Sequence, residues 1–305
     1  MLDFLPGVST SRLGNVPVDT LRTKDLTHPV FQILVRSFLR GADSRRVLVN
    51  SFHGVEAGAV EALRAQNVKM TPIGPTFGVG HNKDSPSLLD EAQSKCLRWL
   101  DKQAPKSVVY VAFGSAGFLS GEEIREMAMA LEIFGRPFLW AIRDGSATDS
   151  LPENFRSGYL PAEKGLIVSW APQRHVLEHK SVGVFVSHCG WNSILESVWS
   201  GVPIVGCPRV SEQNTNMWLV QEWGIGVSGV NTMMGGIGSL CSATLIQALQ
   251  HIMGGACMDT DDELCRVNFR KKVAEVTVAA HTAVSPSGTS TQEFQAFVKD
   301  LLVKF

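Results

Sequence analysis

The stretch FVSHCGWNS at residues 185–193 gathers hydrogen-bonding side chains directly after an apolar run. If the apolar run is a buried strand and a helix follows it, the residues between them form the turn that leads into the helix. The first N–H groups of a helix have no internal partner and carry partial positive charge, and Gly190 lets a bound group approach closely. With His188, Asn192 and Ser193 as further donors, the turn is predicted to bind an anion such as a phosphate.

The alternative is an ordinary strand-to-helix turn in which Asn192 or Ser193 caps the helix, since both residue types are favoured caps. Trp170 favours the binding interpretation, because it follows another apolar run and opens the sequence WAPQ. Pro172 stiffens that loop, so the indole can be held as a flat surface on which a base stacks.

Short apolar segments alternate with segments of helical period along most of the chain. Strands are predicted at 46–51, 68–74, 107–113, 136–142, 165–170, 183–187 and 201–206. Helices are predicted at 55–66, after the S-x-x-E capping box of Ser120 and Glu123, at 194–200, at 216–223 and at 287–305. This alternation predicts an α/β fold with a doubly wound parallel sheet, whose ligands bind beyond the carboxyl ends of the strands.

The segment from Trp170 to Gln213 resembles, position by position, the 44-residue signature of plant family 1 UDP-glycosyltransferases. The matching residues are Trp170, Ala171, Pro172, Gln173, His188, Cys189, Gly190, Trp191, Asn192, Ser193, Glu196, Ser197, Gly201, Val202, Pro203, Pro208, Gln213 and Asn216. The segments SVVYVAFGS, RPFLWAIR, LPENF and SGTSTQEFQAFVKDL resemble other parts of the same family. So many spaced matches are far more specific than a short motif.

The resemblance implies a GT-B fold: a complete C-terminal Rossmann-like domain preceded by the tail of an N-terminal Rossmann-like domain. Residues 1–75 would be a remnant of the acceptor domain and 76–92, rich in Gly, Pro and Ser, a linker. Residues 93–285 would form the UDP-sugar-binding domain, and 286–305 a C-terminal helix.

The family's activity implies transfer of a hexose, with glucose the expected sugar, from UDP to a hydroxyl of a small lipophilic acceptor such as a plant phenolic. The transfer would invert the anomeric carbon and need no metal or cofactor. By resemblance, Trp170 would stack on uracil, the Ala171 backbone would hold the base edge and Gln173 would lie near the ribose. Glu196 would accept hydrogen bonds from the ribose hydroxyls, a role that suits a carboxylate near the positive end of a helix.

The resemblance also implies which residues meet the diphosphate and the sugar. His188, Asn192, Ser193 and the Gly114–Ser115 turn would bind the diphosphate. Trp191, Glu212 and Gln213 would face the sugar. The family generally has Asp where this chain has Glu212, and the extra methylene moves the carboxylate by about a bond length, which changes the hydroxyl it meets.

The family's catalytic base is a histidine early in the N-terminal domain, oriented by an aspartate further along. This chain is expected to begin after both, and neither His28 nor His53 stands in the expected context. No catalytic base is therefore assigned. The alternative function is a protein that binds a UDP-sugar without transferring it.

Composition excludes several other classes of protein. With 28 basic and 29 acidic residues the formal net charge is -1, so no long-range field attracts nucleic acid. The six cysteines contain no C-x-x-C pair, which indicates a reducing compartment and predicts a cytoplasmic protein. A monomer is also expected. No apolar run reaches the ~18 residues of a membrane span.

The sequence contains two further motifs that are typical of other functions. HVLEH at 175–179 matches a zinc peptidase pattern, with His175, Glu178 and His179 as the metal-site residues. GIGVSG at 224–229 matches G-x-G-x-x-G, but it follows a helical segment and does not open a helix, the reverse of a dinucleotide fingerprint. Both are disfavoured, because a zinc peptidase would leave the long signature as coincidence.

Overall fold

The computed structural model describes most of the chain, and Ser115 and His28 lie outside the described residues. The described residues are 46–78, 91–114, 119–142, 148–156, 163–231, 238–254 and 260–302, with isolated residues between 27 and 44. Within these ranges, 91–94 and 260–268 are described by their backbone alone.

The fold is built around a six-stranded sheet with the order β5-β4-β3-β6-β7-β8, in which all neighbours are parallel. The strands are β3 (Val108–Ala112), β4 (Phe138–Ala141), β5 (Gly165–Val168), β6 (Val182–Ser187), β7 (Ile204–Gly206) and β8 (Gly226–Ser228). Every residue of the central strands β3 and β6 is buried, as expected for a sheet covered on both faces. The predicted doubly wound parallel sheet is confirmed.

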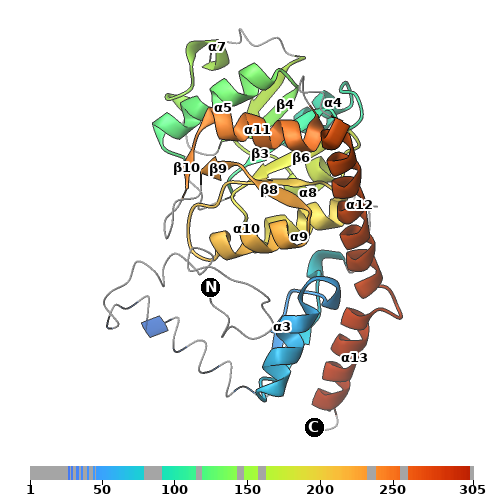
Figure 1. Ribbon diagram of the computed structural model, residues 1–305. Helices are drawn as coiled ribbons and strands as arrows, with labels where there is room; N and C mark the ends of the chain where they lie inside the picture. Colours follow the sequence, from blue (N-terminus) through green and yellow to red (C-terminus); the bar gives the residue numbers. More distant parts are fainter. Residues whose placement is uncertain are drawn as a thin grey trace.

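Helices cover both faces of this sheet (Figure 1). Those described are α4 (Glu91–Leu100), α5 (Gly121–Phe134), α7 (Glu153–Arg156), α8 (Gln173–Leu177), α9 (Trp191–Ser200), α10 (Gln213–Glu222), α11 (Ser242–Met253) and α12 (Thr260–Ala283). Apolar residues of α5 and α11 pack on one face. Those of α4 and α8, and of α9 and α10, belong to clusters that include residues of β3, β6 and β7 on the other. A short antiparallel pair, β9 (Val230–Asn231) and β10 (Ser239–Leu240), follows β8.

The capping box predicted at the start of α5 is present. The Ser120 hydroxyl accepts a hydrogen bond from the backbone N–H of Glu123, and Glu123 Oε2 accepts one from the Ser120 N–H at 2.9 Å. The same carboxylate is held by Arg209, with Nη1–Oε1 at 2.6 Å and Nη2–Oε2 at 2.8 Å. The two side chains are only 13% and 12% exposed, so a buried ion pair ties the start of α5 to the segment after β7.

A smaller unit lies below the large domain and packs against α12 (Figure 1). It consists of β1 (Val47–Val49), α3 (His53–Ala65) and β2 (Met70–Pro72), followed by the short helix η2 (Thr76–Gly78). Strands β1 and β2 are parallel, so the predicted βαβ unit is confirmed. Phe52 is completely buried in one cluster with residues of α9 and α12, which joins this front unit to the large domain.

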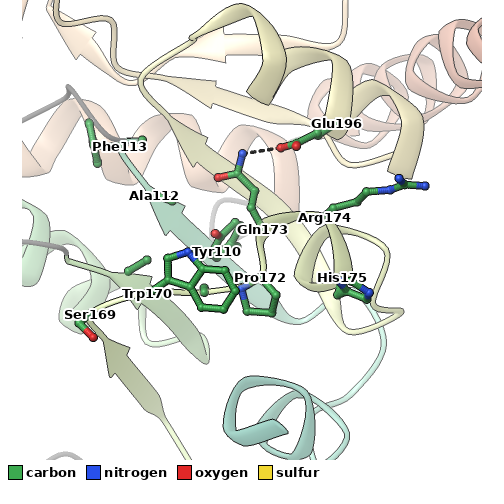
Figure 2. Close-up of a pocket in the computed structure, with 13 residues that line it drawn as sticks. Tyr110, Ala112, Phe113, Ser169, Trp170, Pro172, Gln173, Arg174, His175 and Glu196 are labelled. Atoms are coloured by element: carbon green, nitrogen blue, oxygen red, sulfur yellow. Dashed lines mark hydrogen bonds between the residues drawn. The ribbon is translucent and has the colours of Figure 1, made fainter. Parts of the chain in front are cut away.

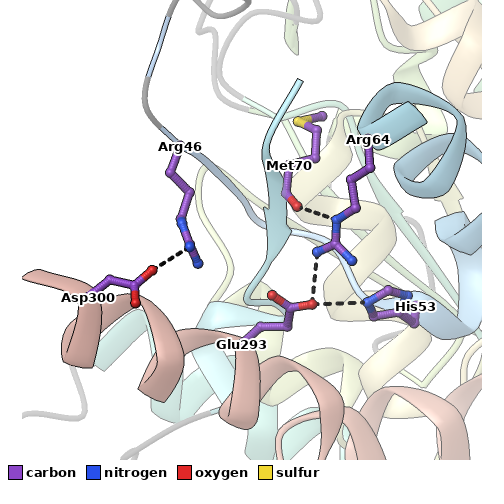
Figure 3. Close-up of polar contacts among 6 residues, drawn as sticks. All are labelled: Arg46, His53, Arg64, Met70, Glu293 and Asp300. Atoms are coloured by element: carbon purple, nitrogen blue, oxygen red, sulfur yellow. Dashed lines mark hydrogen bonds and ion pairs between the residues drawn. The ribbon is translucent and has the colours of Figure 1, made fainter. Parts of the chain in front are cut away.

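The closing helix α13 (Thr289–Leu302) lies beside β2. Figure 3 shows the polar contacts that hold it there: Arg46 pairs with Asp300 at 2.6 Å and Arg64 with Glu293 at 2.8 Å. Part of its apolar side remains exposed, with Leu302 72% accessible. The domain boundaries at 75, 92 and 285 stay a prediction.

Candidate functional site

The order of the strands locates one crevice in the sheet. From β3 the chain proceeds outward through β4 and β5, then returns to β6 on the other side and proceeds through β7 and β8. The direction therefore reverses between β3 and β6, and doubly wound sheets bind ligands beyond the carboxyl ends at such a point. Gly114 follows β3 and His188 follows β6, so both stand at this point.

The His188 ring lies against two glycine backbones. A Cβ atom at Gly114 would come within 2.7 Å of His188 Nε2, and one at Gly190 within 2.5 Å of the same nitrogen. Gly114 also has a positive φ of 66°, which disfavours any side chain there. Both positions therefore require glycine while the imidazole occupies this place.

His188 carries a buried polar atom without a partner. The residue is 9% exposed, and its Nδ1 has no hydrogen-bond partner in the described part of the chain. Burial lowers the pKa of His188 to about 4, so the ring is neutral at pH 7. A buried polar atom left unpaired is costly, and such atoms in native structures often mark a place where another group binds.

The neighbouring helix begins without a side-chain cap. Gly190, which has no side chain, is the N-cap of the ten-residue α9, and no side chain among the described residues caps this helix end. Ser193 Oγ instead accepts a hydrogen bond from Gln173 Nε2 at 2.9 Å, and Asn192 is exposed. The capping alternative is therefore wrong, and the partial positive charge at the start of α9 is not offset by a described capping side chain.

A cavity of about 490 Å³ adjoins this junction, at the carboxyl ends of β3, β4 and β5 (Figure 2). Its wall is completed by α8 and one residue of α9. Five residues predicted to bind the ligand line it: Gly114, Trp170, Ala171, Gln173 and Glu196. The other lining residues, none of which was predicted to contact the nucleotide, are Tyr110, Ala112, Phe113, Ala141, Ser169, Pro172, Arg174 and His175.

Figure 2 shows Trp170 and Glu196 on opposite sides of Gln173. The indole of Trp170 is 41% exposed at the cavity, which leaves a ring face open for stacking. Gln173 Nε2 also donates to Glu196 Oε2 at 2.6 Å and so orients the carboxylate. Burial raises the pKa of Glu196, against the opposing effects of this hydrogen bond and of the charge of Arg174.

Arg174 lines the cavity and also contacts a residue far away in the sequence, Phe77. Its Nε donates to Glu178 Oε1 at 3.0 Å, while its Nη1 donates to the Phe77 carbonyl at 3.0 Å. The guanidinium also lies 5.5 Å from the centre of the Phe77 ring. The sequence carries only one hint of this residue, its position next to Gln173.

The residues predicted to face a sugar lie outside the lining of this cavity. The Trp191 indole N–H donates to the Asn50 carbonyl at 2.7 Å. Gln213 Oε1 accepts hydrogen bonds from the backbone N–H groups of Arg209 and Val210 at 2.8 and 3.0 Å. Glu212 is exposed, and its sugar contact, like those of Trp191 and Gln213, stays a prediction.

The zinc alternative gains no support from the geometry. Glu178 is paired with Arg174, and His179 contacts Ser181 at 2.8 Å and Asp101 at 3.2 Å. Across the described residues, no group of three or more His, Cys, Asp or Glu side chains could hold a metal ion. The GIGVSG motif contains the edge strand β8, and no helix follows it directly.

A pH test follows from the burial of His188. Its pKa lies near 4 in the folded state and near the ordinary 6.5 in the unfolded state, so the unfolded chain takes up a proton first as pH falls. The penalty for folding is absent above about pH 6.5 and grows as pH falls toward 4. We expect a His188→Asn variant to lose less unfolding free energy than the parent between about pH 6.5 and 4.5, by up to about 2 kcal/mol. Urea unfolding at both pH values measures this difference, and equal losses would contradict it.

Comparisons with known proteins agree with this geometry. Residues 90–259 match the family model described as UDP-glucoronosyl and UDP-glucosyl transferase. The chain is 37% identical over 268 residues to UDP-glycosyltransferase 71C3 of Arabidopsis thaliana, a match that covers 85% of this chain and 54% of the relative. It is 36% identical over 299 residues to the anthocyanidin 3-O-galactosyltransferase F3GT1 of Actinidia chinensis var. chinensis, covering 96% and 60%.

Among solved structures, the chain resembles a UDP-glucose: anthocyanidin 3-O-glucosyltransferase in complex with UDP. The TM-score is 0.82 at 30% identity, over 98% of this chain and 63% of that one. This similarity confirms the predicted GT-B fold. The chain spans little more than half the length of the curated relatives that it matches.

None of the helices in the described segments is long and apolar enough to cross a membrane.

Proposed function

Because this chain belongs to the UDP-glycosyltransferase family, we propose that it binds a UDP-sugar and transfers the hexose to a hydroxyl group of a small lipophilic acceptor. In this proposal the uracil stacks on Trp170 and the ribose meets Glu196. The diphosphate lies between His188 and the start of α9, at the reversal point of the sheet.

One observation carries the proposal: the His188 ring, whose buried Nδ1 has no partner among the described residues, lies against Gly114 of the cavity wall and against Gly190 at the start of α9. A diphosphate at this place would accept hydrogen bonds from the first N–H groups of α9 and from the His188 ring. A neutral imidazole donates through one nitrogen only. The proposal therefore requires the His188 tautomer whose proton is on the nitrogen that meets the diphosphate.

The nucleoside part is supported by the geometry of the cavity. The exposed face of Trp170 offers a stacking surface, which is worth about 1–3 kcal/mol per base. Gln173 holds one oxygen of Glu196, which leaves the other carboxylate oxygen able to accept from a ribose hydroxyl. The volume of about 490 Å³ lies within the range of small-molecule sites.

The transfer step is proposed as an inverting displacement. The acceptor oxygen forms a bond to the anomeric carbon while the bond from that carbon to the UDP oxygen breaks, and the acceptor proton passes to a general base that is not assigned. The donors at the start of α9 and His188 stabilise the negative charge that develops on the departing UDP. In this mechanism they replace a metal ion.

Glucose is the proposed donor sugar and a phenolic compound the proposed acceptor. Two of the similar proteins act on an anthocyanidin, one as a galactosyltransferase and one as a glucosyltransferase, so the family likeness alone does not decide the sugar. Glu212 and Gln213 are the residues proposed to choose it. Parallel assays with UDP-glucose and UDP-galactose test the choice.

Binding without transfer is the second candidate function. Transfer needs a general base, and His53 of the front unit does not line the cavity. Its Nε2 lies 3.8 Å from Glu293 Oε1 of α13 instead (Figure 3). Calorimetry with UDP and a transfer assay with phenolic acceptors separate the candidates. Binding with turnover supports the transferase, binding without turnover supports the second candidate, and no binding contradicts both.

We also propose that the protein works in the cytoplasm. The four cysteines whose side chains are described, Cys96, Cys189, Cys207 and Cys241, carry free thiols, and the first three are buried. Free thiols are typical of a reducing compartment.

Replacing Trp170 with alanine is expected to weaken UDP binding by about 1–3 kcal/mol, because the variant loses the stacking surface. Calorimetry with UDP measures the change. Trp199→Ala is the matched control, since the Trp199 ring stacks on His281 at 3.7 Å and does not line the cavity. Equal affinities of the parent and the Trp170 variant would remove this residue from the site.

A further inference from the structure

A second, larger cavity of about 740 Å³ lies at the opposite end of the six-stranded sheet. Lys106 and Arg136 precede β3 and β4, and Pro203 precedes β7, so the cavity opens at the amino ends of the strands. Its remaining wall comes from the end of α11 and the middle of α12. The nucleotide cavity opens at the carboxyl ends, so the two are separate sites.

Much of this cavity is apolar. Ile252 and Val273 are buried in its wall, Met253 and Phe269 are half-buried, and Val278 is 64% exposed. An apolar side chain as exposed as Val278 gains free energy when an apolar ligand covers it. The wall therefore suits the hydrocarbon or aromatic part of a ligand.

Three cations surround the same space: Lys106, Arg136 and Arg270. None of the three forms a side-chain hydrogen bond or ion pair with another described residue, and no acidic residue lines the cavity among those described. Partial burial and the positive charge of Arg270 lower the pKa of Lys106. Among the described side chains, these cationic groups thus have no counter-charge within ion-pair distance.

The backbone at Lys106 is strained. Its φ is 55°, in the left-handed region that a lysine rarely adopts. A Cβ atom at Gly183 would collide with the Lys106 carbonyl oxygen, so the glycine in β6 lets this turn approach the strand. Strained residues persist only where the surrounding structure holds them, and they are common at binding sites.

We propose that this cavity binds a small amphipathic anion, with its carboxylate, sulfonate or phosphate group at Lys106, Arg136 and Arg270 and its apolar body against α11 and α12. Charge-assisted hydrogen bonds from guanidinium and ammonium groups are the strongest kind available to such a head group. The volume is that of a drug-sized ligand site.

Fluorescence titration of the full chain with anilinonaphthalene sulfonate tests this proposal, followed by displacement with octanoate and with octanol. The dye and octanoate share a charged head and differ in an aromatic or aliphatic body, so they tell which body the site prefers. We expect octanoate to displace the dye and octanol to do so at least about tenfold less well. Saturating UDP should leave the dye bound. Displacement by UDP, or equal displacement by both alcohol and acid, would overturn the proposal.

Variants localise the site. Arg270→Gln should weaken the dye by at least about tenfold, whereas Lys272→Gln, a change on the same helix at a cation paired with Glu275, should not. Ala274→Trp, which fills the cavity and keeps all three cations, is the second variant and should also abolish dye binding. Phe294→Ser tests the exposed side of α13, where another apolar hollow lies. Loss of the dye in that variant, or equal affinities of the Arg270 and Lys272 variants, would overturn the assignment.

Discussion

Replacing Glu123 with glutamine is expected to lower the free energy of unfolding by about 3–5 kcal/mol. The buried Arg209 guanidinium lies 2.6 Å from the Glu123 carboxylate, and the amide of glutamine cannot neutralise it. The glutamine side chain still carries an oxygen that can accept from the Ser120 N–H, so the effect comes chiefly from the unpaired charge. Urea unfolding at neutral pH measures the loss.

Glu122→Gln is the matched control, because Glu122 precedes Glu123 in the first turn of α5 and is exposed. A double variant, Glu123→Leu with Arg209→Met, removes both charges and should recover much of the lost stability, since no buried charge is left alone. A loss below about 1 kcal/mol in Glu123→Gln, similar to that of the control, would show that water or another group compensates the arginine.

His188→Ala is expected to weaken UDP by about ten- to a hundredfold while uridine binding changes little. The reason is that hydrogen bonds to charged groups contribute about 1.5–3 kcal/mol, and uridine lacks the diphosphate. Calorimetry with both ligands on the parent and the variant gives the comparison. His188→Asn, which keeps a side-chain donor, should recover part of the UDP affinity and leave the uridine affinity unchanged. Losses of equal size for UDP and uridine would contradict a diphosphate role for His188.

The sequence predicted the strands of the sheet better than its periphery. The runs that form β3 and β6 are continuous and apolar, as strands buried on both faces must be. Their secondary structure can therefore be predicted from the local sequence alone. Strand β8 lies within GIGVSG, where three glycines hide the apolar pattern, and it was missed. Helices α4, α11 and α12 were also not predicted; the N-cap of α11, for example, is Cys241, which makes no side-chain cap.

The site was predicted in part for the same reason. Trp170, Gln173 and Glu196 come together because the signature and the carboxyl-end rule both concern short segments at strand ends. The isolation of His188 Nδ1 depends on packing between segments far apart in the chain. The contact of Trp191 with Asn50 likewise joins positions 141 residues apart, which no local pattern encodes.

That contact has a mechanical consequence. Trp191 is the first residue of α9, and its indole is anchored to the Asn50 carbonyl just after β1. The front unit and the first turn of α9 therefore cannot move independently. A shift of one either moves the other or breaks the hydrogen bond between Trp191 and Asn50. In the proposed complex, the affinity for UDP therefore depends on the position of the βαβ unit, although that unit contributes no residue to the cavity wall.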